Sequence, residues 1–239
     1  EAASSPLFDK YSIVFHNAEG GALMDFEKYF GKKMAARLQP PNVDQDDPNH
    51  PTCLEETHDA IGDWFRSGPT VYLLDSMDVQ VPRAWLKKIV KDRKATEKGK
   101  EIGGSYGTEK ARINSDRFRQ LPALLKVHNS ILIVISQSRE NIGFDAMFNP
   151  KTRSGGKAMT FYSALELWTR VEGHYKKKVG DYQLEQGVKC GVRVKRNRIT
   201  GRDRSVKVPI FHSYGIDDLG GMVDWLEDIG HWKKSGGRL

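Results

Sequence analysis

Three short apolar segments that each lead into a polar side chain constrain the fold more than any other feature of the sequence. They span Tyr11–His16, Thr70–Ser76 and Ser130–Ser136, and their β-branched and aromatic residues are typical of buried strands. Stretches with helical periodicity lie between them. This alternation predicts an α/β fold in which a mostly parallel, twisted sheet is flanked by helices.

The remaining elements follow from the same periodicities. Helices are predicted at Asp25–Leu38, Cys53–Ser67, Pro82–Lys100, Asn114–Val127, Lys157–Ala164 and Leu219–Ile229. Later strands are predicted at Leu165–Val171, Gly187–Arg196 and Ser205–Phe211, and because they follow one another they favour antiparallel strands at one edge of the sheet. Pro40–Pro51 and Gln137–Gly156 are predicted to be loops. We expect one core over residues 1–215 and a short helical segment over residues 216–239.

Charge and cysteine content limit the classes of function. The 239 residues include 38 Lys and Arg against 31 Asp and Glu, a formal net charge of +7. Such a balance favours a polyanionic partner, although a solvated basic surface gives the same count. Cys53 and Cys190 have no metal-type spacing. No apolar run approaches the roughly 20 residues that span a bilayer, and no signal-peptide pattern is present, so we expect a cytoplasmic protein without a membrane partner.

Polar residues follow the three predicted strands at positions suited to a nucleotide. Ligands of open α/β sheets collect outside the carboxyl ends of the strands, which is where Glu19, Asp75 and Gln137 fall. A carboxylate such as Asp75 can hold Mg²⁺, Glu19 can orient a water for attack on a γ-phosphate, and the Gln137 amide can sense that phosphate. Each residue alone could simply form a turn.

The segment after Gln137 contains a cationic, glycine-containing stretch. Gly155 and Gly156 let backbone N–H groups approach a phosphate that a Cβ would block, and Arg153 and Lys157 supply positive charge beside them. An ordinary flexible loop with glycine and lysine for solubility is the alternative. A loop of about 20 residues without secondary structure is uncommon in a compact domain unless it is functional or disordered.

Several ordered segments resemble those of one known family. They are ILIVISQSRENIG followed by FNPKTRSGGKAMTFYSALEL, EIGGSYGTEKARINSDRFRQL, VRVKRNRI, GIDDLGGMVDWLEDIG and AEGGALMD. Over about Tyr11–Trp232 the chain resembles the ATPase core of RecA-type homologous recombinases, in a divergent form such as a phage encodes. Ordered matches at compatible spacing are stronger than any one motif. The resemblance implies a RecA-like P-loop NTPase core.

The resemblance also implies roles for individual residues. Glu19 would be the water-activating base, Asp75 with Ser76 the magnesium-associated pair, and Gln137 the switch that couples the γ-phosphate to the following loop. The positions that would grip single-stranded DNA are Arg112, Ser115, Arg119, Arg153, Gly155, Gly156 and Lys157. Arg196 and Arg198 would reach the ATP of a neighbouring subunit, and as arginines they offer planar forks suited to phosphate.

One departure from the family is large. The motif G-x-x-x-x-G-K-[ST], whose loop binds nucleotide phosphates, does not occur. We therefore expect a core that lacks its N-terminal P-loop element, and we expect this core to be inactive alone. In the complete protein the resemblance implies an ATP- and Mg²⁺-dependent recombination and repair protein that binds single-stranded DNA and homologous duplex DNA and forms a homo-oligomeric filament or ring. The alternatives are a non-catalytic single-strand binding module and a helicase of the same core.

The predicted helix Pro82–Lys100 is heavily cationic. A charge run of this kind is most often a solvated face. The sequence leaves open whether this helix contacts duplex DNA.

Overall fold

The computed structural model describes residues 5–42, 50–96, 107–140, 151–153 and 157–233. By its internal contacts the chain divides into two compact units, residues 1–162 and residues 163–239. This division falls inside residues 1–215, which are predicted from the sequence to form one core, and that domain assignment stays a prediction.

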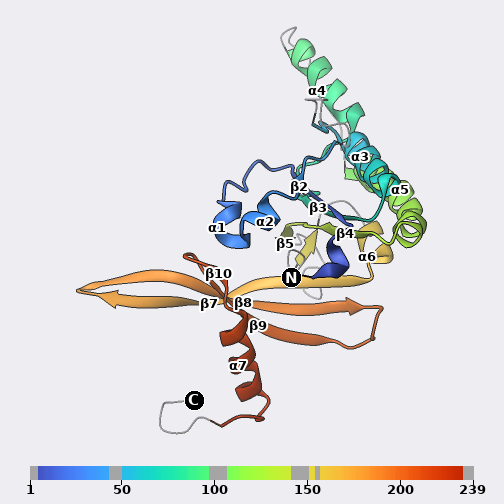
Figure 1. Cartoon of the computed structure of the whole chain (residues 1–239). Coiled ribbons are helices and arrows are strands. Elements are labelled where there is room, and N and C mark those ends of the chain that lie inside the picture. Colours follow the sequence, from blue (N-terminus) through green and yellow to red (C-terminus); the bar gives the residue numbers. More distant parts are fainter. Residues whose placement is uncertain (1–4, 43–49, 97–106, 141–150, 154–156, 234–239) are drawn as a thin grey trace. The chain divides into compact units, whose positions relative to one another are not determined.

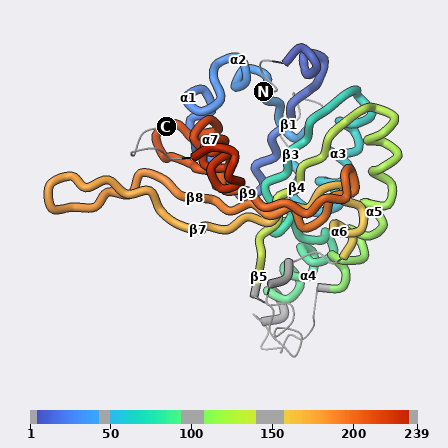
Figure 2. Tube along the Cα trace, turned by 90° about the horizontal axis from the view of Figure 1, so that it is seen from below, coloured from blue at the N-terminus to red at the C-terminus, as the bar shows by residue number. Residues whose placement is uncertain are grey.

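A four-stranded parallel sheet is the centre of the first unit. Its order is β2-β1-β3-β4, with β1 at Ser12–Asn17, β2 at Leu38–Gln39, β3 at Thr70–Asp75 and β4 at Ile131–Val134. Asn17 pairs with Asp75, and Leu74 pairs with Val134. Figure 2 shows β1, β3 and β4 side by side. The predicted α/β class and parallel sheet are therefore confirmed.

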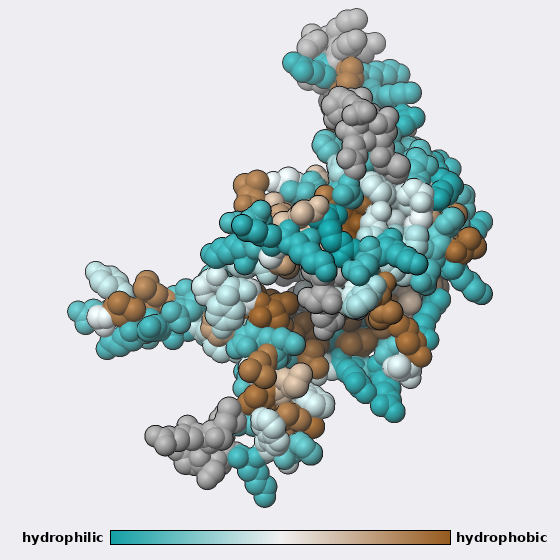
Figure 3. Space-filling model, viewed as in Figure 1, coloured by the Kyte–Doolittle hydropathy of each residue, from teal (hydrophilic) through white to brown (hydrophobic). Residues whose placement is uncertain are grey.

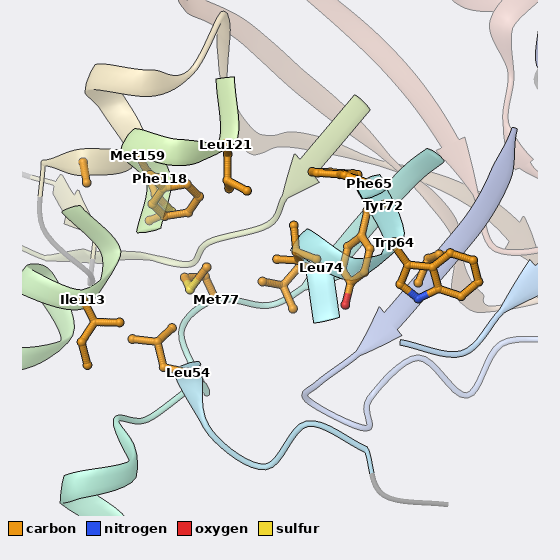
Figure 4. Packing of buried hydrophobic residues seen from close by; sticks show 13 residues of the cluster. Leu54, Trp64, Phe65, Tyr72, Leu74, Met77, Ile113, Phe118, Leu121 and Met159 are labelled. Carbon is orange, nitrogen blue, oxygen red and sulfur yellow. The ribbon is translucent and has the colours of Figure 1, made fainter. Parts of the chain in front are cut away.

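One face of this sheet is buried against helices. Thr70, Tyr72 and Leu74 alternate along β3 as buried residues, which is the period-two pattern of a strand with one covered face. The helices of this layer are α3 (Leu54–Ser67), α5 (Gly107–Val127) and α6 (Ala158–Tyr162). Their apolar side chains meet β3 in one cluster (Figure 4), which includes Leu54, Ile61, Trp64, Phe65, Ile113, Phe118, Leu121 and Met159.

The predicted helix Asp25–Leu38 is wrong in its extent. It is two short helices, α1 (Phe26–Phe30) and α2 (Lys32–Ala35), because Gly31 between them has a φ of 81° that breaks the helix. Leu38 belongs instead to β2. A 3-10 turn at Pro6–Phe8 precedes β1.

Two further predictions change in the first unit. Helix α5 begins at Gly107 rather than Asn114. The predicted loop Gln137–Gly156 contains an antiparallel pair of strands, β5 (Ser138–Glu140) and β6 (Lys151–Arg153). The structure also contains helix α4 at Arg83–Thr96, so the inner part of the predicted helix Pro82–Lys100 is helical and its last residues lie outside the described ones.

The second unit is an antiparallel sheet with one helix. Its order is β10-β9-β8-β7, and Figure 1 shows β7 and β8 as a long two-stranded ribbon. The elements are β7 (Leu165–Val179), β8 (Tyr182–Asn197), β9 (Arg204–Phe211), β10 (Gly215–Ile216) and α7 (Asp218–Asp228). Antiparallel strands were predicted at one edge of the parallel sheet; they form a sheet of their own, and β7 and β8 are longer than predicted.

The turn between β7 and β8 uses Gly180, whose φ is 60°.

Within the described residues, no helix combines the length and the apolar character that crossing a membrane requires.

Candidate functional site

The carboxyl ends of β1, β3 and β4 bring the predicted strand-end residues together. β1 and β3 are parallel and in register up to the pair Asn17 and Asp75. The chain turns after β1, and the Glu19 backbone N–H donates to the Asp75 carbonyl over 3.1 Å. Backbone pairing thus fixes where the Glu19 side chain starts, beside the end of β3.

The Glu19 carboxylate is the centre of this site. Its Oε1 accepts a hydrogen bond from the Gln137 side-chain amide over 2.9 Å, and the Ser76 hydroxyl donates to the same oxygen. Ser76 is fully buried, whereas Gln137 is exposed. The peptide bond between Asp75 and Ser76 is cis. The structure therefore places Glu19, Asp75, Ser76 and Gln137 in one cluster, while the chemical roles assigned to them stay predictions.

Negative charge accumulates at this cluster. Burial raises the pKa of the Asp75 carboxyl above its ordinary value, and the neighbouring charge of Glu19 raises it further. A bound cation would offset both effects. Mg²⁺ prefers oxygen ligands and usually binds through one or two carboxylates together with substrate phosphates and water. Asp75 and Ser76 fit that donor set, although no group of three or more His, Cys, Asp or Glu in the described residues could hold a metal ion unaided.

Asp78 and Lys110 also belong to this site, although neither was predicted from the sequence. The Gln137 backbone N–H donates to Asp78 Oδ2 over 2.7 Å. Lys110 Nζ donates to the carbonyls of Met77 and Asp78 over 2.7 and 2.9 Å, and burial lowers the pKa of this amine. Lys110 therefore holds the turn that carries Ser76 and Asp78. The acidic Asp78 so soon after Asp75 was a usable signal; nothing in the sequence pointed to Lys110.

The predicted DNA-gripping residues fall into two groups in the first unit. Arg112, Ser115 and Arg119 lie on α5 at a spacing that places them on one face of the helix. Arg112 and Arg119 are exposed, and Arg112 lies 3.9 Å from Asp116.

The second group surrounds the glycine pair. Arg153 ends β6, and Lys157 is exposed directly before α6. Gly155 and Gly156 lie outside the described residues. These assignments stay predictions.

Arg196 and Arg198 lie in the second unit. Arg196 is on β8, where it pairs with Glu166 of β7. The backbone N–H of Arg198 donates to the Ala164 carbonyl over 2.9 Å, and the Arg198 side chain is exposed. Arg196 is half-buried at the end of β8 and Arg198 follows the strand, and their contact with a neighbouring subunit's nucleotide stays a prediction.

Comparison with known proteins gives consistent matches over this chain. The RecA N-terminal domain family matches residues 21–217. Protein RecA of Thermus aquaticus is 28% identical over 234 residues, which cover 94% of this chain and 62% of the relative. Protein RecA of Streptococcus sanguinis is 29% identical over 240 residues, covering 99% and 59%. Protein RecA of Thermus thermophilus is 31% identical over 189 residues, covering 79% and 51%. The chain thus spans between about half and two thirds of these relatives' length.

Proposed function

Because the chain belongs to the RecA family, we propose that it is the nucleotide-reading core of a DNA recombination and repair protein. In the complete protein it would act as a DNA-dependent ATPase that assembles on single-stranded DNA and promotes strand exchange with homologous duplex DNA. The observation that carries this proposal is the hydrogen bond from Gln137 to Glu19. This bond joins the Glu19 carboxylate, just after β1, to Gln137, which begins the segment that leads to Arg153 and Lys157.

Glu19 suits the role of a general base. Its Oε1 accepts hydrogen bonds from the Ser76 hydroxyl and the Gln137 side-chain amide. If Gln137 turned away, Oε1 would lose one of these donors and could accept a hydrogen bond from an attacking water instead. The same movement would shift the start of the segment that leads to Arg153 and Lys157. One side-chain rotation would therefore link proton abstraction to the DNA grip.

Magnesium and ATP fit this cluster in part. Asp75 and Ser76 would hold Mg²⁺, and the ion with its triphosphate would supply the electrophilic phosphorus and neutralise charge that develops on the phosphate oxygens. Arg196 and Arg198 would contribute cations from an adjacent subunit. The sequence contains no G-x-x-x-x-G-K-[ST] motif. Residues 1–239 would therefore supply side chains for ATP hydrolysis but no recognised phosphate-binding loop.

That missing motif favours a second candidate, a single-strand binding module without nucleotide chemistry. The two candidates differ in one observable. A recombinase hydrolyses ATP faster when single-stranded DNA is present, whereas the module binds DNA and shows no ATP turnover at any DNA concentration.

Gln137→Ala in the full-length protein tests the proposal. ATP binding should stay within about twofold of wild type, because Gln137 acts in coupling. Stimulation of hydrolysis by single-stranded DNA should fall by a factor of roughly 5–150, the usual range of coupling between two sites. Steady-state ATP hydrolysis with and without a single-stranded oligonucleotide measures both quantities. Gln120→Ala, an exposed glutamine of α5, is the matched control. Undiminished stimulation in Gln137→Ala would contradict the switch role.

A further inference from the structure

Helix α4 is anchored to the rest of the first unit at its first turn. The Arg83 backbone N–H donates to Glu55 Oε2 over 2.9 Å, and the Arg83 guanidinium lies 3.1 Å from Glu56. Just before the helix, the Val81 carbonyl accepts from the Leu54 N–H over 2.8 Å. These contacts attach the base of α4 to the first turn of α3 and fix the direction in which α4 leaves it.

Beyond this base α4 projects away from the other elements of the first unit (Figure 1). No other described helix or strand packs along it. Ile89 and Val90 are 44% and 57% exposed, although aliphatic side chains on a helix usually face a neighbour. The helix is thus held firmly at one end and presents most of its length to solvent.

The exposed length is cationic. The basic residues of α4 are Arg83, Lys87, Lys88, Lys91, Arg93 and Lys94, against one carboxylate, Asp92. Arg83, Lys87 and Lys91 recur every four residues, so they share one face and rise about 6 Å per step. In the described part of the chain, Lys87 and Lys91 have no ion-pair partner. In Figure 3 the visible surface of α4 is mostly hydrophilic.

We propose that α4 is a contact site for the phosphate backbone of double-stranded DNA. The proposal rests on the proposed function and adds to it a place where the duplex is engaged. Lys87 and Lys91 would each neutralise a phosphate and release condensed counterions. An α-helix of about 10–12 Å diameter also fits the major groove, which is about 12 Å wide. Duplex DNA therefore matches both the charge and the shape of the exposed rod.

A membrane surface fits α4 less well. Interfacial helices bury a broad apolar face in the lipid. On α4, Trp85 and Leu86 are already half-buried in the protein, which leaves Ile89 and Val90 as the exposed aliphatics. Two such side chains form a small apolar area beside the cations. Electrostatic contact with a polyanion is the stronger match.

The position of α4 along the chain agrees with this assignment. It begins shortly after β3, whose end carries Asp75, and it precedes α5, which carries Arg112. A duplex bound on α4 would therefore be held by the segment that connects the nucleotide cluster to the predicted single-strand grip.

The test compares two double variants of the full-length protein. Lys87→Gln with Lys91→Gln removes the proposed contacts, and Lys32→Gln with Lys33→Gln, both exposed on α2, makes the same charge change elsewhere. Binding to a labelled duplex without homology is followed by fluorescence anisotropy over a salt series. We expect the α4 variant to bind several-fold more weakly, with a plot of log affinity against log salt that is flatter by about one to two units. The control should match wild type.

Further probes separate the other outcomes. Stimulation of ATP hydrolysis by single-stranded DNA should be unchanged in the α4 variant, and anionic vesicles and polyglutamate should bind wild type and variant alike. An unchanged duplex affinity and slope would overturn the proposal, as would an equal loss of single-strand binding. A loss seen only with vesicles or only with polyglutamate would assign α4 to another partner and also overturn it. Failure of the wild type to hydrolyse ATP would refute the proposed function alone, provided duplex binding through α4 is retained.

Discussion

His16 links the pH of the solution to the stability of the core. It is 4% exposed on β1, and its Nδ1 lies 3.0 Å from the Tyr72 hydroxyl. Burial, with a smaller contribution from the charge of His50, lowers the pKa of His16 from 6.5 to about 4. The unfolded chain therefore takes up this proton first as the pH falls. Stability from neutral His16 is complete above about pH 6.5 and is lost between pH 6.5 and pH 4.

We expect the free energy of unfolding to decrease by up to about 3 kcal/mol over that interval from His16 alone, at about 1.4 kcal/mol per pH unit. Urea denaturation at pH 7.5 and pH 4.5 measures it. His16→Gln should be less stable at neutral pH but change less with pH, whereas His231→Gln, an exposed site, should follow wild type. Equal pH dependence in His16→Gln and wild type would show that another group titrates.

Single residues of the candidate site were predictable only where they follow a recognisable strand. Glu19, Asp75 and Gln137 were found because each comes after an apolar segment, and parallel strands bring their carboxyl ends together. Lys110 was not found, since it reaches the backbone carbonyls of Met77 and Asp78 from the first turn of α5. Such a contact depends on how α5 packs, which no local pattern records.

Helices and strands were predictable where burial of one face imposes a regular spacing of apolar residues, and they were less predictable elsewhere. β1, β3 and β4 were recovered to within two residues at each end, because one face of each packs against the apolar cluster that α3 and α5 help to form. β5 and β6 were missed, because each has three residues without alternating hydrophobicity. The predicted strand at Leu165–Val171 ended too early, since β7 continues through Lys176, Lys177 and Lys178, where neither face is buried. There the strand persists by cross-strand backbone pairing with β8.

Strand β4 has an open apolar surface that should cause association. Among the described residues β4 pairs with β3 alone. Ile131 and Ile133 on it are 41% and 46% exposed, and Ile135 directly after it is 41% exposed. An apolar edge strand of this kind is a template for pairing with another chain. We therefore predict that the 239-residue chain self-associates in a concentration-dependent way.

Ile133→Lys tests this prediction. A lysine at the centre of β4 should suppress association, because charged side chains block pairing at sheet edges. The cost in stability should be about 1 kcal/mol or less, as the site is half-exposed. Sedimentation velocity at several concentrations gives the association state. Val127→Lys, at the exposed end of α5, is the control and should associate like wild type. Equal association in both variants would place the contact elsewhere.

Over the whole molecule, buried apolar area is concentrated in the first unit. Every buried hydrophobic residue of the described chain lies between Ile13 and Met159. In the second unit β9 pairs with β8 only from Gly187 to Val194, so the outer part of the β7–β8 ribbon has two strands. A two-stranded ribbon without a hydrophobic face is at best marginally stable in water. The two units should therefore differ in local opening free energy.

Amide hydrogen exchange followed by mass spectrometry measures that difference. Peptides that contain Tyr72 and Leu74 should open only with global unfolding, typically about 5–15 kcal/mol, whereas residues 176–184 should open at nearly no cost. The expected protection differs by a factor of at least about 1000, with the β8–β9 pairing in between. Because cross-strand hydrogen bonds are present in both places, apolar burial is the variable under test. Protection of residues 176–184 equal to that of β3 would mean that backbone pairing alone stabilises the ribbon, or that another surface covers it in solution.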